Sequence, residues 1–289
     1  MEPLSSKTPI LANAGNHETL NEPGFVAFRT RFGAMPFESP RFDDSGSLFY
    51  STEVGAMHIV CLSAFSDFSE TSVQTFFLIN DLASVNRTRT PWLIAAFHAP
   101  WYNSNKNHYL TAEAMMVAYE PLLLAARVNI VMVGHVHAFQ RTPLVGADGE
   151  VMPVESGLGA YHWMVGISGK SLYANWVPEE FPEPQPSGKP PNNWVAARDS
   201  TFFGMAFLEV PNATHARMVV YCTERSPASA PGLCDPDTPL DDVWVENQLV
   251  ARPIVPTPSP TPSASVTASA SAADAGALTL GCVLVLAHV

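Results

Sequence analysis

The sequence has few basic residues. It contains 15 Lys and Arg against 27 Asp and Glu, which gives a formal net charge of −12, and it has no run of basic residues. This balance argues against binding to a nucleic-acid backbone, so we expect no nucleic-acid partner. An anionic substrate would need local help from metal ions or a helix N-terminus.

Cysteine is also scarce. None of the four cysteines forms a CxxC pair, which argues against a structural zinc site, although Cys222 and Cys234 could close a short loop as a disulfide. The first ten residues lack a basic stretch followed by an apolar core, so the chain as given has no signal peptide.

Other features nevertheless indicate an extracellular or secretory-pathway location. Asn86 and Asn212 each begin an Asn-x-Thr acceptor for N-glycosylation, and the Ser/Thr/Pro stretch after Pro253 resembles an O-glycosylated stalk. Glycosylation acceptors without an export signal suggest that the true start of the protein lies upstream of Met1.

The end of the chain has no pattern of a folded core. Residues 251–276 are rich in Ser, Thr, Pro and Ala, and we expect them to form a disordered stalk. Residues 277–289 are apolar but too short to span a bilayer, which takes roughly 20 residues. They could be a lipid-anchor signal that gives membrane attachment, or simply a disordered or truncated end. This leaves residues 1–250 as one folded domain, whose oligomeric state the sequence does not determine.

Within that domain, short apolar runs alternate with helical patterns. Ranges 10–14, 56–62, 92–97 and 129–133 are apolar throughout and predict strands buried on both faces. Residues 72–84 and 111–127 have the spacing of helices, the first with Ser72 as a potential N-cap and the second with Pro121 inside it. Later, "FFGMAFLEV" and "ARMVVYC" predict an antiparallel hairpin. The fold class is therefore α/β.

Polar residues follow three of these strands. Asn16 and His17 come after the first, His98 after the third, and His135 and His137 after the fourth. Because the carboxyl ends of parallel strands meet at one edge, we expect these clusters to converge. Gly15 and Gly134 stand where the chain leaves two of the strands, and we expect positive φ there.

Imidazole nitrogens together with an amide oxygen suit zinc, iron or manganese. A single histidine at a strand end is usually structural, but three such strand ends make accidental convergence improbable. The remaining histidines outside these clusters and the 98–108 segment are interpreted as structural or incidental; they are His58, His162, His215 and His288.

The stretches "GNHE", "AFHAPWYNSN" and "VMVGHVHAFQR" resemble three of the five metal-site blocks of the purple acid phosphatases, within the calcineurin-like metallophosphoesterase superfamily. The resemblance covers roughly residues 1–225. It implies a layered α/β/β/α sandwich and makes residues 1–250 a metallophosphoesterase catalytic domain that is incomplete at its N-terminus.

The resemblance also implies roles for individual residues. Asn16, His98 and His135 would hold a divalent ion, and His137 would help to hold a ferric ion, in a binuclear centre of Fe(III) with Zn, Mn or Fe(II). Two outer histidines, His17 and His108, would bind phosphate oxygens or protonate the leaving alkoxide. Asn107 occupies a substrate-binding position where the family commonly has histidine. Either His108 alone is the proton donor, or the substrate preference differs.

The activity implied by the family is that of an acid phosphatase acting on phosphorylated small molecules or phosphoproteins. In its two-metal mechanism a metal-bound hydroxide attacks the phosphate monoester. Two further family blocks, which supply the bridging carboxylate, should precede Asn16, where only residues 1–15 stand. We therefore expect this chain alone to have little activity. Alternatives are a phosphodiesterase or nucleotidase of the same superfamily, or a non-catalytic cell-surface binding protein with a degenerate site.

Overall fold

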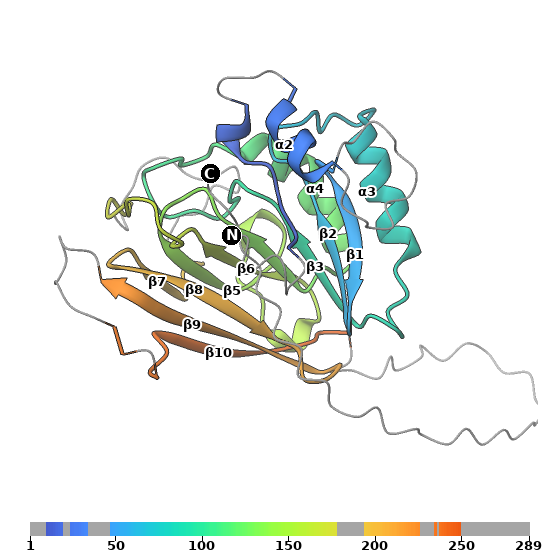
Figure 1. Ribbon diagram of the computed structural model, residues 1–289. Coiled ribbons are helices and arrows are strands. Elements are labelled where there is room, and N and C mark those ends of the chain that lie inside the picture. The colour runs from blue at the N-terminus through green and yellow to red at the C-terminus, as the bar shows by residue number, and fades with distance from the viewer. Residues whose placement is uncertain are drawn as a thin grey trace, which may run out of the picture.

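The computed structural model describes residues 10–19, 24–33, 47–177, 194–225, 234–235 and 237–249. The stalk expected at 251–276 and the apolar tail at 277–289 lie outside these residues, as does His288. The described residues build two β-sheets and a set of helices (Figure 1).

The larger sheet has seven strands in the order β1-β2-β3-β4-β6-β5-β7. Strands β2, β3, β4 and β6 run parallel to one another, and β1, β5 and β7 are antiparallel to their neighbours. The strands are β1 (Tyr50–Val54), β2 (Met57–Cys61), β3 (Trp92–Ala96), β4 (Ile130–Val133), β5 (Phe139–Val145), β6 (Ala160–Val165) and β7 (Ala197–Asp199).

The smaller sheet is antiparallel, with the strand order β10-β9-β8. Its strands are β8 (Phe202–Glu209), β9 (His215–Arg225) and β10 (Asp241–Glu246). The pairing of β8 with β9 confirms the hairpin expected from the sequence. Arg141 on β5 ties the two sheets together, because its guanidinium donates to both carboxylate oxygens of Asp241 at 2.6 and 3.1 Å.

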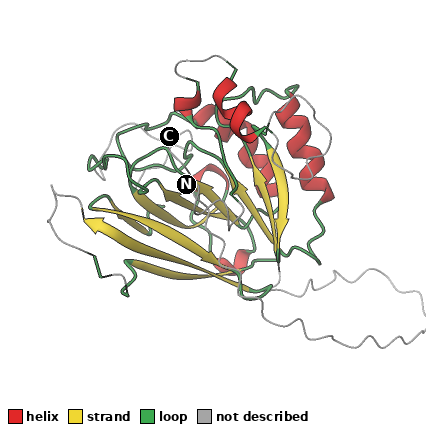
Figure 2. Ribbon diagram, in the orientation of Figure 1, coloured by secondary structure: helices red, strands yellow, loops and turns green. Residues whose placement is uncertain are grey.

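The parallel strands of the larger sheet are buried on both faces, and β3 shows how their side chains divide between two cores. Leu93 and Ala95 pack with the helices α3 (Val73–Ser84) and α4 (Glu113–Ala125). Ile94 and Ala96 point the other way and pack with the smaller sheet. This alternation follows from the two-residue period of a strand. Figure 2 shows the same layering, with helices in red and strands in yellow.

Both predicted long helices are present. The Ser72 hydroxyl caps α3 by accepting a hydrogen bond from the amide of Thr75 at 3.1 Å. Pro121 lies inside α4, where it cannot donate to the carbonyl four residues earlier. That carbonyl belongs to Val117, whose side chain is on the exposed face of the helix, so water can replace the lost partner. The shorter helical elements are η1 (Asn16–Glu18), α2 (Val26–Phe32), η2 (Ala147–Gly149) and η3 (Val154–Ser156).

The strand expected at residues 10–14 is wrong. The segment has no regular secondary structure, although Leu11, Ala12 and Ala14 are buried. Its polar contacts come from side chains instead of a ladder: the amide of Asn13 donates to the carbonyls of Leu62 and Ala96, both at 3.1 Å. The run is apolar because it crosses the ends of β2 and β3 and covers the core there.

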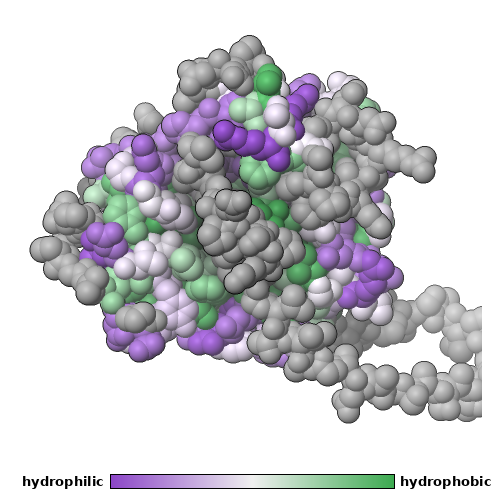
Figure 3. Space-filling view, in the orientation of Figure 1, coloured by the Kyte–Doolittle hydropathy of each residue, from purple (hydrophilic) through white to green (hydrophobic). Residues whose placement is uncertain are grey.

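The layered α/β architecture expected from the sequence is confirmed, and the described residues supply its helical layer and both sheets. In the view of Figure 3 hydrophilic residues (purple) appear at several places along the edge, and hydrophobic residues (green) appear among them and near the centre. Among the described helices, none is both long enough and apolar enough to cross a membrane.

Candidate metal centre

The ends of β3 and β4 bring two of the predicted ligands together. His98 follows β3 and His135 follows β4, and the amide of Gly134 donates to the carbonyl of His98 at 3.0 Å, which locks the two strand ends side by side. Both histidines are buried. Nε2 of His98 lies 3.1 Å from Nδ1 of His135, and their ring centroids are 4.8 Å apart.

Asn16 adds a third donor atom next to His98. It is the first residue of η1, and its Oδ1 lies 3.1 Å from Nε2 of His98. Ligand atoms that are about 2.0–2.1 Å from a zinc-sized ion lie roughly 3.0–3.4 Å from one another in tetrahedral or octahedral arrangements. The two 3.1 Å separations that join these atoms therefore fit three ligands of one divalent ion.

Two tight backbone arrangements position these ligands. His135 has φ of 62°, in the left-handed region, so the positive φ expected at Gly134 falls on the histidine itself. Gly15 is also not in that region, since its φ is −104°. It is needed for space: a Cβ there would lie 2.7 Å from Cε1 of His98. The expectation of positive φ at both glycines was wrong.

His137 is buried on the same loop and is oriented by a carbonyl. Its Nδ1 lies 2.7 Å from the carbonyl oxygen of Ser171, which fixes Nδ1 as the donor and leaves the lone pair on Nε2 for a ligand role. Its ring stacks on Tyr173 with centroids 4.2 Å apart. Burial lowers the pKa of His137, with nearby Lys170 and His17 as smaller causes, so the neutral imidazole is favoured.

The two outer histidines also reach the cluster. The ring of His108 lies 3.8 Å from that of His135, centroid to centroid. Burial lowers the pKa of His108, and the proximity of His137 and His17 lowers it further. His17 itself is exposed on η1. The structure therefore gathers Asn16, both outer histidines and the three strand-end histidines at one edge of the larger sheet.

Asn107 lies beside this cluster on a fixed backbone. Its amide donates to Oδ1 of Asn105, and its carbonyl accepts from Nδ2 of Asn103, both at 3.0 Å. Among the described residues its buried side-chain oxygen has no hydrogen-bond partner.

Sequence reasoning missed the contribution of the 171–173 segment. Tyr173 stacks on His137, its amide donates to the His137 carbonyl at 2.9 Å, and Ser171 orients the same ring. The segment follows β6 with neither helical nor strand periodicity. Phe65, whose ring lies 5.8 and 6.0 Å from those of His98 and His135, was missed for the same reason.

The remaining predicted sites lie elsewhere. In the structure Cys222 and Cys234 are joined as a disulfide. Asn86 and Asn212 are both exposed, each at a turn in which its side-chain oxygen accepts backbone hydrogen bonds.

The histidines outside the cluster differ from those within it. His58 on β2 lies 2.9 Å from Asp81 on α3, and burial lowers the pKa of His162 to about 3, so that it is neutral at physiological pH. His215 is exposed at the start of β9.

The cluster offers imidazole nitrogens and an amide oxygen as ligand atoms, whereas a carboxylate-rich site would offer oxygens alone. In the part of the chain that the structure describes, no three His, Cys, Asp or Glu side chains are arranged to hold a metal ion. The candidate set of Asn16, His98 and His135 relies on an amide oxygen as its third donor. These residues fit one borderline-soft divalent ion of the zinc, iron or manganese type.

Comparison with known proteins identifies the class. Residues 1–139 match the family model described as calcineurin-like phosphoesterase. The first half of the chain is therefore similar to the calcineurin-like phosphoesterases, in agreement with the layered sheets and the strand-end histidines.

Named relatives narrow this class further. Purple acid phosphatase 18 of Arabidopsis thaliana is 35% identical over 254 residues, which cover 86% of this chain and 52% of the relative. Phosphoenolpyruvate phosphatase of Allium cepa is 33% identical over 217 residues, covering 72% of this chain and 43% of that protein. The chain is thus similar to the purple acid phosphatases among the metallophosphoesterases, and it spans about half the length of the curated relatives it matches.

A solved structure supports the fold. The purple acid phosphatase from yellow lupin (Lupinus luteus) seeds superposes with a TM-score of 0.62 at 20% sequence identity, and the match covers 91% of this chain and 45% of that one.

Proposed function

We propose that this protein hydrolyses phosphate monoesters, as an acid phosphatase, with metal ions held by the histidine cluster. The observation that carries the proposal is the convergence of Oδ1 of Asn16, Nε2 of His98 and Nδ1 of His135, with 3.1 Å separations, at the carboxyl ends of parallel strands. That edge is where ligands of open α/β sheets bind.

In this proposal Asn16, His98 and His135 hold the divalent ion, and Nε2 of His137 is one ligand of a ferric ion. Bound ions of this kind supply Lewis acidity toward phosphoryl oxygens and lower the pKa of a water molecule. The protein supplies the rest. The carbonyl of Ser171 and the ring of Tyr173 hold His137 in one orientation, and the burial of the three histidines keeps bulk water away from their donor atoms.

His17 and His108 are the residues that we assign to the substrate. His17 follows Asn16 directly and is exposed, so its ring is accessible to a phosphate oxygen of the substrate. His108 lies closer in, against His135. Burial lowers its pKa in the free protein, but the negative charge of a bound phosphate favours the protonated ring, which can then donate a proton to the leaving alkoxide. Asn107, one residue earlier, would add an amide to the substrate contacts.

The sequence and the site do not restrict the leaving group of the ester. The proposed substrates are therefore phosphorylated small molecules or phosphoproteins. We further propose residues 1–250 as the catalytic unit and a secretory-pathway location. The exposure of both glycosylation acceptors, Asn86 and Asn212, supports that location.

The proposal is tested by selectivity between two esters. The 289-residue chain is loaded with iron and zinc and assayed at pH 5 with p-nitrophenyl phosphate and with bis(p-nitrophenyl) phosphate. We expect at least tenfold faster turnover of the monoester, lost on chelation; a weak rate suffices because the readout is a ratio. Preference for the diester, or metal binding without hydrolysis of either ester, would overturn the proposal in favour of a phosphodiesterase or a binding protein.

Replacement of His108 tests the proton donor. His108→Ala should slow hydrolysis of an alkyl phosphate by ~10²- to 10⁴-fold, because its leaving alkoxide needs a proton. Hydrolysis of p-nitrophenyl phosphate, whose leaving group is stable without one, should fall much less. His108 has φ of 58°, so His108→Asn, which tolerates positive φ, controls for the backbone. Equal loss on both substrates would remove His108 from the acid role.

A further inference from the structure

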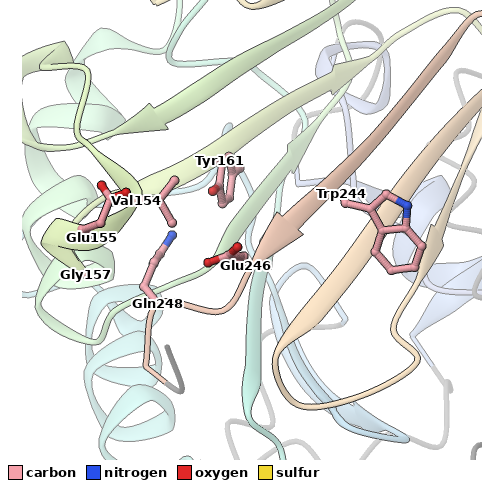
Figure 4. Close-up of a pocket in the computed structure, with 7 residues that line it drawn as sticks. All are labelled: Val154, Glu155, Gly157, Tyr161, Trp244, Glu246 and Gln248. Carbon is pink, nitrogen blue, oxygen red and sulfur yellow. The ribbon is translucent and has the colours of Figure 1, made fainter. Parts of the chain in front are cut away.

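A second concave site lies at the opposite end of the larger sheet from the histidine cluster. It is a cavity of about 350 Å³, lined by residues of η3, β6, β10 and the segment after β10: Val154, Glu155, Gly157, Tyr161, Trp244, Glu246 and Gln248 (Figure 4). Tyr161 on β6 pairs with Ile130, the first residue of β4, whereas His135 follows the last residue of that strand. The length of β4, roughly 10 Å, therefore separates the two sites at the least.

The backbone around this pocket is fixed by buried hydrogen bonds. Asn247, which is fully buried, donates to the carbonyls of Pro91 and Ala213 at 2.8 and 3.0 Å. Its side-chain oxygen accepts from Nδ2 of Asn129 at 3.0 Å. The residue that follows it, Gln248, therefore projects from an anchored chain.

Gln248 is the feature that points to a ligand. Its side chain is only 4% exposed, and among the described residues neither its Oε1 nor its Nε2 has a hydrogen-bond partner. Burying a carboxamide with both groups unpaired costs free energy, and such groups are rare in folded proteins. Figure 4 shows this amide beside Val154, with the carboxylate of Glu246 and the hydroxyl of Tyr161 on the same side.

The other lining groups restrict what the ligand can be. Glu155 and Glu246 make the pocket negative, and no Lys or Arg lines it, which disfavours an anion. Burial raises the pKa of the Tyr161 phenol to about 12, and the negative charge of Glu246 is a second cause. An alkylammonium ion would suit the carboxylates, but it only donates hydrogen bonds and would leave Nε2 of Gln248 unpaired.

A hydroxyl group both donates and accepts, so neighbouring hydroxyls can pair with both atoms of the carboxamide and also donate to the carboxylates. The apolar side chain of Val154 and the ring of Tyr161 offer surface for the C–H face of such a molecule. The volume is at the lower end of the range for small-molecule pockets and suits one sugar ring. We propose that this pocket binds a neutral, hydroxyl-rich ligand of the size of a monosaccharide, with Gln248 as its central contact.

The test uses saturation-transfer NMR on the full 289-residue chain with D-glucose, D-galactose, D-mannose and N-acetyl-D-glucosamine, and with 1,4-diaminobutane as the cationic probe. We expect transfer to the C–H protons of at least one sugar. Gln248→Met keeps the length of the side chain without its polar atoms, so it should weaken that sugar at least tenfold while the thermal unfolding midpoint stays the same or rises.

Two further variants separate the sources of binding. Glu246→Gln keeps a hydrogen-bonding group but removes the charge, so it should change sugar affinity by less than threefold. The matched control Glu224→Gln lies at the far end of β9, where Glu224 is exposed, and should change nothing. Absence of transfer to every sugar, full binding by Gln248→Met, or tighter binding of the diamine that is lost in Glu246→Gln would each overturn the proposal.

Discussion

His135→Ala is expected to abolish binding of the divalent ion. The residue supplies Nδ1, which lies 3.1 Å from Nε2 of His98, and its ring centroid lies 4.8 Å from that of His98 and 3.8 Å from that of His108. Loss of a supporting residue around a metal typically lowers its affinity 10- to 100-fold, and loss of a direct ligand should lower it further. Zinc titration followed by calorimetry measures the effect.

The backbone at this position needs its own control. His135 has φ of 62°, which alanine adopts only with strain, whereas glycine adopts it freely. His135→Gly should therefore lose the metal while keeping the loop, and His215→Ala, which removes an exposed histidine on β9, should keep full stoichiometry. One zinc per chain in His135→Gly would remove this residue from the ligands.

Local patterns account for what could be predicted from the sequence. The ranges expected for β2, β3, β4 and the two long helices agree with the structure to within about two residues. The three strands are buried at every position and therefore form continuous apolar runs, whereas the helices bury apolar residues at helical spacing. β5 escaped notice because it mixes polar residues with Pro143, which lies at the register shift between Arg141 and Leu144.

The errors arise where one segment crosses another. Residues 10–14 are apolar like a strand, yet Asn13 bonds to the carbonyls of Leu62 and Ala96 in place of a ladder. Gly15 is required by the ring of His98, 83 residues away, and not by its own dihedral angles. Contacts of this kind leave no periodic signal in the sequence.

The residues of the candidate site also fall into those that could be predicted from the sequence and those that could not. His98, His135 and His137 could be found because they follow buried strands, and the topology of a parallel sheet then brings strand ends together, whereas the roles of His17 and His108 came from the family resemblance. Ser171 and Tyr173, which orient His137, lie in an irregular segment and became apparent only from the fold. The positions of strand ends therefore predict where ligand side chains lie. The residues that orient those side chains depend on how the loops fold.

Gly166→Ala is expected to disable the metal site from a position that holds no ligand. Gly166 follows β6, and its amide donates to the carbonyl of Ala138 at 3.1 Å. A Cβ at this residue would collide with the carbonyl oxygen of Val136 and lie 3.4 Å from Cα of His137. Because both neighbours are backbone atoms of the loop between His135 and His137, that loop must move. We expect zinc affinity to fall at least tenfold and stability to fall by about 1–3 kcal/mol.

The control has to separate loss of stability from loss of the site. Gly159 precedes the same strand at its other end, has φ of 104°, and a Cβ there would lie 2.7 Å from the carbonyl oxygen of Val145. Gly159→Ala should therefore destabilise the fold by a similar amount, measured by urea unfolding, but leave zinc binding unchanged. If both variants bind zinc equally well, the loop tolerates displacement, and the placement of His135 and His137 does not depend on the close approach of β6.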